Sequence, residues 1–474
     1  MRDQVKSPPQ AAAPSLVDWL LMLFPAAMLL VLLLRHVWDV DIFWQLKLGE
    51  LILDRGGPVL REPFAASHLD EPLAGVAWLG QAAMAAVRRL GGWNALRVFD
   101  ALCWLGGFWA VAAACRARGA AAPGVVMALL LPFMAALPTA SIRPQSFAAL
   151  CLGLLLALLR LELRPLTTVA LAVPLLVLWQ NLHPSVSVAL VVLGVTAAAD
   201  WYRRWRGQGA APVAATMLVP LAALAIFATP DGFSILAVSA RNAQASMAIG
   251  ASEWLPLWIA ANRTNAVPVV VVAVLTLYMA MKRPRRIDLA EAAVALSLFV
   301  MVLLTYRFVL FWAVAMVPVI ARLATADEAA QTHGLSRWLA PLTVGLVAVL
   351  TPLAAPTRFS DTLPMEAIAR LKLQDVHGVI YADFPYGGPI IDAGYPDWRV
   401  AYDGRYYRYT SEEWHFNGDI EGGHKGLRDI LAKWRVAAFL LKSSHNGPLA
   451  AELSRNPDWR RVWTDGDVVV YVRR

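Results

Sequence analysis

The sequence predicts a polytopic α-helical membrane protein with a small α/β domain at its C-terminal end. Of the 474 residues, 58% are hydrophobic and only 16% are charged. The mean hydropathy of +0.54 exceeds what a soluble domain of this length needs. A second observation is a change of composition near Thr357, after which short polar and strand-like segments replace the long apolar runs.

The net charge of +8 does not indicate a nucleic-acid partner. Lys and Arg occur in short clusters between apolar runs, which is the distribution that sets the orientation of membrane helices. The expected surroundings of this part of the chain are therefore membrane lipids. The three cysteines lie in apolar stretches, with neither disulfide nor metal-ligand spacing.

The apolar runs give the number of spans, because crossing a bilayer takes roughly 20 apolar residues. The first run, 16–37, meets this length and lacks a small-residue cleavage site, so we expect it to remain as a signal anchor. Further runs are found at about 95–115, 120–140, 145–160, 166–182, 185–200, 211–229, 266–281, 288–305, 308–323 and 337–355. Together they predict about 11 spans.

The basic clusters predict the orientation. They fall in every second loop, at 116–118, 160–164, 203–206 and 282–286. The positive-inside rule places these loops in the cytoplasm, together with the N-terminus and its Arg2 and Lys6. An odd number of spans then places the C-terminal domain outside. We expect a multi-pass protein of the bacterial inner (cytoplasmic) membrane with a periplasmic C-terminal domain.

Two domains are predicted, a transmembrane domain at 1–356 with a first outer loop at 38–92, and an extracytoplasmic domain at 357–474. In the loop, the Ala-rich segment 76–90 is expected to be an interfacial helix. The second domain alternates strand patterns with helix patterns, which indicates an α/β fold. The strands are expected at 378–384, 398–402, 436–441 and 468–472, and the helices at 426–435 and 449–455.

Asp39 and Asp41 lie directly after the first span. Carboxylates at membrane depth are costly and usually functional. The alternative is that one of them only caps the next helix. On a helix, side chains two positions apart point about 200° apart, so one aspartate would cap or orient while the other faces a cavity. Gln45 shares a helical face with Asp41 at i, i+4.

Other polar residues are expected at the same face of the membrane. Arginine suits bidentate capture of phosphate, and the predicted phosphate contacts are Arg143, Arg241 and Arg307. The ordinary alternatives are that arginines at span ends snorkel and that a histidine in a turn is structural. The candidates for substrate contact in the membrane part are Gln45, Lys47, Gln145, His183 and Glu253.

The segment 402–409 of the C-terminal domain combines a carboxylate, arginines and four tyrosines. Aromatic faces beside polar groups are typical of a sugar-binding surface, which makes Asp403, Arg405 and Tyr406 candidates for substrate contact. The alternative is a strand followed by a β-turn at Asp403-Gly404, with the tyrosines packed at the membrane interface.

A long first span, then an outer loop that opens with Asp-x-Asp and carries an interfacial helix, resembles the C-type (GT-C) superfamily of integral-membrane glycosyltransferases. The stretches that resemble a bacterial branch of it are 39–49, 58–64, 77–81, 143–145, 179–183 and 402–405. That branch often has His where this chain has Gln45, and Gly-Gly where this chain has Pro184-Ser185. The change at Gln45 removes one candidate metal ligand.

The resemblance implies an enzyme that transfers a sugar, with inversion, from a polyprenyl-phosphate donor to a lipid or glycan acceptor at the outer face of the membrane. An aspartate of the first outer loop would be the general base, which by position is Asp41, with Asp39 as the alternate. No cofactor is implied with certainty, and a divalent metal at Asp39/Asp41 stays an alternative. The competing hypotheses are a transporter or flippase for a lipid-linked saccharide and a non-catalytic assembly partner. An internal repeat would favour a transporter, and the sequence shows none.

Overall fold

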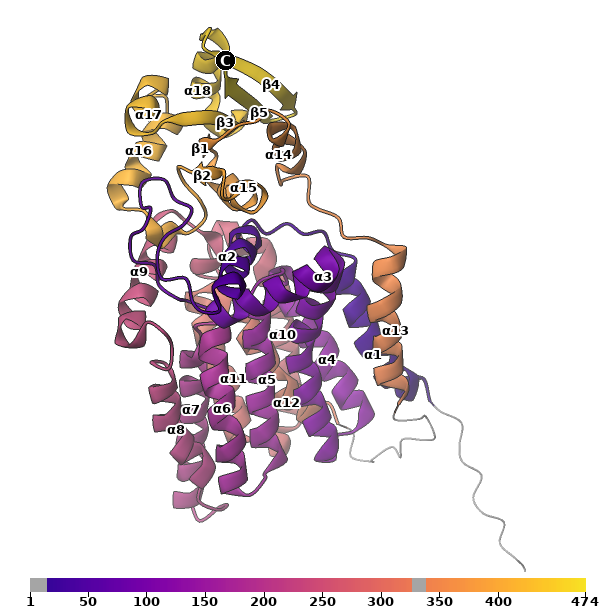
Figure 1. The fold of residues 1–474 in the computed structure, drawn as a ribbon. Coiled ribbons are helices and arrows are strands. Elements are labelled where there is room, and N and C mark those ends of the chain that lie inside the picture. Colours follow the sequence, from indigo (N-terminus) through magenta and orange to yellow (C-terminus); the bar gives the residue numbers. More distant parts are fainter. Residues whose placement is uncertain (1–14, 326–337) are drawn as a thin grey trace, which may run out of the picture.

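The structure, a computed structural model, describes residues 15–325 and 338–474. A bundle of helices carries a smaller mixed domain on one of its ends (Figure 1). Arg2 and Lys6, on which the predicted orientation partly depends, lie outside the described residues.

The bundle confirms a multi-pass membrane protein. Seven of the described helices are long and apolar enough to cross a membrane, and four shorter apolar helices accompany them. These helices coincide with the predicted apolar runs, although the number of true spans stays a prediction. They are α1 (Leu16–Leu33), α3 (Trp78–Ala117), α4 (Ala122–Ala136), α5 (Gln145–Leu161), α6 (Pro165–Leu182), α7 (Val186–Trp205), α8 (Val213–Ala225), α10 (Arg263–Lys282), α11 (Leu289–Leu304), α12 (Val309–Leu323) and α13 (Leu339–Ala354).

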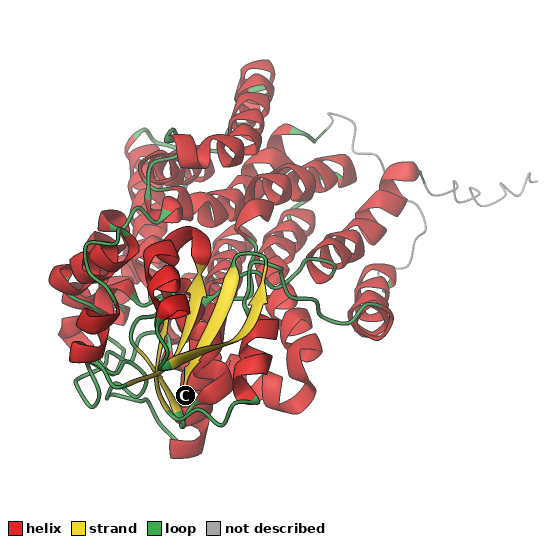
Figure 2. Ribbon diagram, turned by 90° about the horizontal axis from the view of Figure 1, so that it is seen from above, coloured by secondary structure: helices red, strands yellow, loops and turns green. Residues whose placement is uncertain are grey.

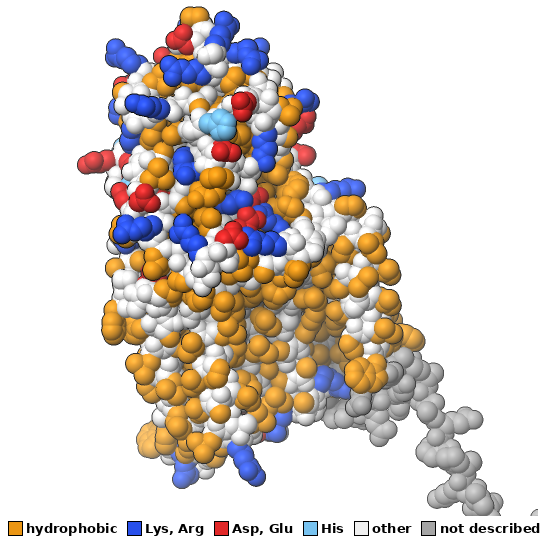
Figure 3. Space-filling model, viewed as in Figure 1, with side chains coloured by type: hydrophobic (Ala, Val, Ile, Leu, Met, Phe, Trp, Pro, Cys, Tyr) orange, Lys and Arg blue, Asp and Glu red, His pale blue; other side chains and the backbone are white. Residues whose placement is uncertain are grey.

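Hydrophobic side chains cover the flank of the bundle. Charged side chains instead gather on the C-terminal domain and at the opposite end of the bundle (Figure 3). Inside, small residues let helices approach closely, as is common between membrane helices. A Cβ added at Gly153 of α5 would overlap the backbone of Gly107 in α3.

The end of the bundle below the C-terminal domain is covered by α2 (Asp41–Arg55) and the first part of α3 (Figure 1). The predicted interfacial helix at 76–90 corresponds to that first part. It leads into the span through a break at Gly91 and Gly92, where Gly92 has a φ of 63° that favours glycine. A Cβ at Gly49 would overlap the Gln81 backbone, so α2 and α3 are closely packed.

A buried arginine ties the carboxyl ends of two spans together. Arg97 donates from Nη1 to the Leu33 carbonyl at 2.9 Å and from Nη2 to the Ala355 carbonyl. Positive charge is favoured at helix C-termini, where carbonyl groups lack partners. Arg97 thereby anchors α1 and α13 just below the Asp39–Asp41 loop.

The C-terminal domain is an α/β domain, as predicted. Its five strands have the order β2-β1-β3-β5-β4, with β1 parallel to β2 and β3, and β5 antiparallel to β3 and β4. Helices pack around this sheet, as seen from above in Figure 2. The strands are β1 (Gly378–Ala382), β2 (Trp398–Val400), β3 (Val436–Lys442), β4 (Trp459–Asp465) and β5 (Val468–Arg473); the helices are α14 (Met365–Lys372), α15 (Gly387–Gly394), α16 (Ser411–Glu421), α17 (Leu427–Lys433) and α18 (Ser443–Arg455).

The loop between α2 and α3 joins the two domains. Its residues at 64–66 extend the sheet beside β2, because Val400 exchanges backbone hydrogen bonds with Phe64 (3.1 Å) and Ala66 (2.9 Å). A Cβ at Gly388 of α15 would overlap the Val40 carbonyl, which brings that helix against the start of α2. The C-terminal domain is therefore fixed directly over the Asp39–Asp41 segment.

Candidate active site

A polar cavity of about 150 Å³ lies between the C-terminal domain and the end of the bundle. Its walls come from α2, the start of α3, the loops that precede α5 and follow α6, α9 (Ile235–Ala248), two short 3₁₀ turns and the turn at 404–407. Most of the predicted site residues line it: Asp41, Gln45, Arg143, Gln145, His183, Glu253, Arg307, Arg405 and Tyr406.

The two aspartates occupy different positions. Asp39 is only 1% exposed, and its Oδ1 accepts a hydrogen bond at 2.9 Å from the backbone N–H of Asp41, the first residue of α2. Its Oδ2 forms an ion pair with Nε of Arg143. Asp41, in the first turn of α2, lies on the cavity wall and accepts at Oδ1 from the Trp44 indole at 3.2 Å.

Arg143 connects the two carboxylates of the cavity, Asp41 and Glu253, with the buried Asp39 behind them. Besides Asp39, its guanidinium lies 3.5 Å from Asp41 Oδ2 and 3.2 Å from Glu253 Oε2. Its backbone N–H donates to Asp100 of α3 at 3.3 Å, which fixes the loop before α5. The surrounding carboxylates raise the pKa of Arg143 well above its usual range, against the opposing effect of burial.

Glu253 bridges the two arginines of the cavity. Its Oε1 lies 3.6 Å from Nη1 of Arg307, while its Oε2 faces Arg143. The Arg307 guanidinium also stacks 4.2 Å from the ring of Trp254. The two arginines lower the pKa of Glu253 although burial raises it, so its carboxylate stays ionised between them.

The pKa of Asp41 is raised to about 7. Burial is the largest cause, and the charges of Asp39 and Glu253 act in the same direction. Arg143 and the Trp44 hydrogen bond act in the opposite direction without cancelling them. A carboxylate with a pKa near 7 is suited to accept a proton at neutral pH.

His183 lines the cavity, and its imidazole ring is neutral. Burial and the charges of Arg307 and Arg143 lower its pKa to about 3. Its Nδ1 lies 2.8 Å from the Ser185 hydroxyl, which in turn accepts from the Trp179 indole at 2.9 Å. The ring is thus held by the turn after α6, and its other nitrogen is the one available to a ligand.

Asp403 and Arg405 do not present their side chains to a substrate. Both are buried, and Arg405 donates bidentately to Glu62 at 2.7 and 2.9 Å and to Asp403 at 2.9 and 2.6 Å. Asp403 also accepts from the Tyr409 hydroxyl at 3.1 Å. Because every carboxylate and guanidinium is already engaged, the structure gives this pair a structural place in the cavity wall, unlike the predicted contact with substrate.

The turn at Gly404, between Asp403 and Arg405, contacts Asp41, the candidate base. A Cβ added at Gly404 would overlap Asp41 Oδ1, so only glycine fits against this carboxylate without movement. Tyr406 and Tyr407 follow in the turn and add aromatic surface to the cavity. Tyr406 thus lies at the cavity, and its contact with a substrate stays a prediction.

The structure does not bring Lys47 and Arg241 to the cavity. Lys47 pairs with Glu50 at 2.6 Å on another face of α2. Arg241 is exposed on α9, while its neighbour Asn242 lines the cavity. Successive helical residues point about 100° apart, so correct placement of a segment at the membrane face does not place each side chain.

Sequence reasoning missed several residues in or next to the site. Trp44, Glu62, Gly404 and Tyr407 were not singled out, although each lies inside or next to a stretch that carried the resemblance. The indole of Trp44 could have been suspected from its i, i+3 position relative to Asp41. Glu62 had no such local signal, because its partner Arg405 is 343 positions away.

The cavity residues do not fit a divalent metal at Asp39/Asp41. Both oxygens of Asp39 are occupied, by the Asp41 N–H and by Arg143. In the described part of the chain, no group of three or more His, Cys, Asp or Glu side chains is arranged to hold a metal ion. We therefore derive no step through a metal.

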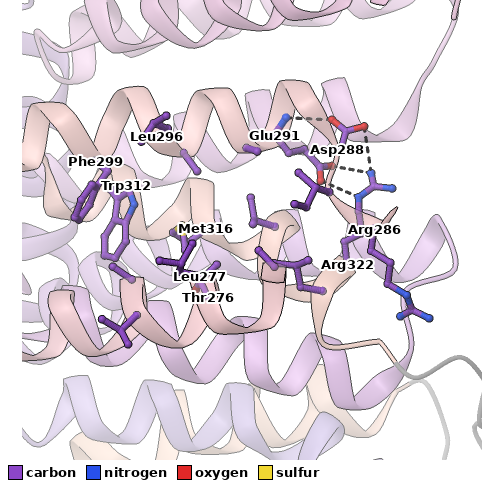
Figure 4. A pocket seen from close by; sticks show the side chains of 18 residues that line it. Thr276, Leu277, Arg286, Asp288, Glu291, Leu296, Phe299, Trp312, Met316 and Arg322 are labelled. Carbon is purple, nitrogen blue, oxygen red and sulfur yellow. Dashed lines mark hydrogen bonds and ion pairs between the residues drawn. The ribbon is translucent and has the colours of Figure 1, made fainter. Parts of the chain in front are cut away.

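Another cavity, of about 390 Å³, lies between α10, α11 and α12 at the other end of the bundle (Figure 4). Its charged residues satisfy one another, since Arg322 donates to Glu291 at 3.1 and 3.2 Å and lies 3.8 Å from Asp288. The rest of its wall is largely apolar, with Leu296, Phe299 and Trp312. Most of the predicted site residues line the first cavity, which we therefore take as the candidate active site.

Comparison with known proteins gives the fold. No family model matches the sequence, and no curated protein matches it. Among solved structures, ArnT from Cupriavidus metallidurans bound to undecaprenyl phosphate aligns with a TM-score of 0.55 at 12% identity, covering 96% of this chain and 98% of that chain. The apo state of ArnT gives a TM-score of 0.59 at 12% identity, covering 96% and 97%. The oligosaccharyltransferase AglB from Archaeoglobus fulgidus, in complex with an inhibitory peptide and a dolichol-phosphate, gives 0.54 at 11% identity, covering 96% and 74%.

Proposed function

Because this chain has the fold of the GT-C glycosyltransferases, we propose that it transfers a sugar from a polyprenyl-phosphate-linked donor to a lipid or glycan acceptor. The observation that carries the proposal is the arrangement of Asp41 beside Arg143 and Arg307 in one cavity. ArnT was solved with undecaprenyl phosphate and AglB with a dolichol-phosphate, and both ligands are lipid phosphates of the kind proposed here.

The proposed reaction is a single displacement at the anomeric carbon. Asp41 takes the proton of the acceptor hydroxyl, and the oxygen attacks the carbon from the face opposite the phosphate. The bond between that carbon and the phosphate oxygen breaks, and the lipid phosphate leaves with the bonding electrons. Arg143 and Arg307 stabilise the charge that develops on it. The product carries the inverted configuration, and Asp41 afterwards releases its proton to water.

Glu253 marks the position of the donor phosphate in this proposal. Its carboxylate lies between Arg143 and Arg307 and is partly exposed. A phosphate group would make the same two ion pairs more strongly, because two guanidinium groups can bind it bidentately. Donor binding would therefore displace the Glu253 side chain and the short turn that carries it, η3 (Ser252–Trp254).

Aromatic residues supply surface for the sugar. Trp44, Trp254, Tyr406 and Tyr407 line the cavity next to the charged groups. Their rings can stack on the apolar face of a pyranose, while Gln45 and Gln145 offer amide groups to its hydroxyls. This arrangement supports a saccharide as the transferred group.

The proposed location is the outer face of the bacterial inner membrane. Basic side chains gather at the end of the bundle opposite the C-terminal domain (Figure 3), and the positive-inside rule assigns such an end to the cytoplasm. The cavity and the C-terminal domain would then face the periplasm.

The test is a transfer assay with purified protein and undecaprenyl-phosphate-linked sugars. We expect release of undecaprenyl phosphate and a product whose anomeric configuration, measured by NMR, is opposite to that of the donor. A transporter or a non-catalytic assembly partner would release no undecaprenyl phosphate with any of the donors. A product of retained configuration would contradict the single displacement.

A further inference from the structure

The cluster of Glu62, Asp403 and Arg405 is fully buried and fully paired. The side chains of all three residues are 0% exposed, and the Arg405 fork donates to both carboxylates at 2.6 to 2.9 Å. Glu62 also accepts from the backbone N–H groups of Phe64 and Ala65 at 2.8 and 3.0 Å. Burial of three charges is costly, and such a cluster is stable only when each group is satisfied in a defined geometry. The cluster therefore holds its surroundings in one arrangement.

The cluster lies directly behind the candidate base. Gly404, between the two paired residues, has no room for a Cβ because Asp41 Oδ1 fills that space. On a second side, the Arg405 guanidinium stacks 5.6 Å from the ring of Trp44. The indole of Trp44 donates to the same oxygen of Asp41 at 3.2 Å. The Asp41 carboxylate thus contacts two groups that Arg405 holds in place.

The two carboxylates of the cluster come from different parts of the chain. Glu62 belongs to the loop between α2 and α3, whereas Asp403 belongs to the C-terminal domain. Arg405 joins them, because its guanidinium pairs with Asp403 and also with Glu62, which lies 343 positions earlier in the sequence. The C-terminal domain therefore supplies a wall of the cavity, and this guanidinium is one of the contacts that hold the wall in position.

We propose that Arg405 is a positioning residue for Asp41: it holds the Gly404 turn and the Trp44 indole against the carboxylate without touching a substrate. This inference rests on the proposed function, in which Asp41 is the general base. It gives the C-terminal domain a part in the chemistry, because the groups that contact Asp41 come from both domains, Gly404 from the C-terminal domain and Trp44 from α2. Misplacement of a catalytic group by about 1 Å can cost roughly 100-fold in rate.

The first test is Gly404→Ala. The added methyl group must displace the Asp41 carboxylate or the turn, so we expect kcat to fall roughly 10- to 100-fold while KM for the donor stays unchanged. The methyl group also excludes water from the carboxylate, which moves the rising limb of the pH–rate profile to higher pH. Gly418→Ala is the matched control, since a Cβ there meets no atom within 4 Å.

The second test is Arg405→Lys. Lysine keeps the charge but cannot donate to Glu62 and Asp403 with a planar fork. The turn loosens and water reaches Asp41, so kcat falls and the rising limb moves to lower pH, opposite to the effect of Gly404→Ala. Arg428→Lys, at an exposed position of the same domain, is the control. The charged and titratable groups that face Asp41 are Asp39, Arg143, Glu253, Arg307 and Tyr406, and all remain in both variants.

The outcomes are distinct for the two proposals. A wild-type protein that releases no undecaprenyl phosphate from any donor contradicts the proposed function. If the wild type is active and Gly404→Ala keeps its kcat and its pH profile, the positioning proposal is overturned while the function stands. A rise in KM with unchanged kcat overturns it too, since that would make the turn a binding element. If Arg405→Lys does not fold, the kcat and pH profile of Gly404→Ala alone test the positioning proposal.

Discussion

The backbone N–H of Asp41 donates to Asp39 Oδ1 at 2.9 Å, so two aspartates that are two residues apart have different roles. Asp39 is buried and pairs with Arg143. Asp41 lies on the cavity wall with a pKa raised to about 7. The first carboxylate organises the site, and the second is placed to accept a proton.

Asp39→Asn tests this division of roles. Asparagine still accepts the hydrogen bond from the Asp41 N–H but has no charge to pair with Arg143. A hydrogen bond between charged groups is worth about 1.5–3 kcal/mol. We expect KM for the donor to rise roughly tenfold or more, with a smaller loss in kcat. Steady-state kinetics with varied donor concentration measures both constants. A loss confined to kcat would contradict the assignment of Asp39 to the phosphate side.

Glu253→Gln tests whether Glu253 occupies the phosphate position. The variant removes the competing carboxylate, so undecaprenyl phosphate should inhibit transfer more strongly than in the wild type, by roughly tenfold. Loss of a nearby negative charge also lowers the pKa of Asp41, and the rising limb of the pH–rate profile moves to lower pH. Weaker inhibition by undecaprenyl phosphate would show instead that Glu253 helps to bind the donor.

Trp44→Phe removes the hydrogen bond to Asp41 Oδ1 while keeping most of the ring. That bond favours the ionised carboxylate, so its loss raises the pKa of Asp41 further above 7. We expect the rising limb to move to higher pH, and kcat at high pH to fall as well, because the indole also holds the carboxylate in place. An unchanged profile would mean that the indole does not act on the base.

Arg405→Ala tests the stability of the joint between the domains. The change leaves Glu62 and Asp403 buried without a cation, which costs about 3–5 kcal/mol. We expect a clear fall of the melting temperature in detergent, whereas Arg428→Ala should leave it unchanged. Equal melting temperatures would show that the cluster does not hold the domains together.

The apolar helices and the α/β fold of the C-terminal part could be predicted because their signals are local, while the domain bounds at 356/357 stay a prediction. Long apolar runs predicted the helices of the bundle, and the Ala-rich segment at 76–90 predicted the helix that becomes the first part of α3. Helical geometry predicted different places for Asp39 and Asp41, but Asp39 lies before the first residue of α2, so this geometry does not explain its placement. In the C-terminal domain, β4 was not predicted, because Arg460 and Arg461 interrupt its strand pattern.

The parts of the site that escaped prediction depend on contacts between distant segments. The Glu62–Arg405 pair joins positions 343 residues apart, and the need for glycine at 404 arises only from the approach of Asp41. Arg241 was predicted at the site but does not reach it. Its segment lines the site, whereas its own side chain is exposed elsewhere on α9. Such placements follow from tertiary packing, which no local pattern encodes.

The most direct test of the account is Asp41→Asn in the transfer assay. Asparagine has nearly the same shape and still accepts the Trp44 hydrogen bond, but it cannot take a proton. We predict a protein that melts like the wild type and still binds undecaprenyl phosphate, with transfer reduced roughly 10²- to 10⁴-fold. Transfer at the wild-type rate by Asp41→Asn would contradict the assignment of Asp41 as the general base.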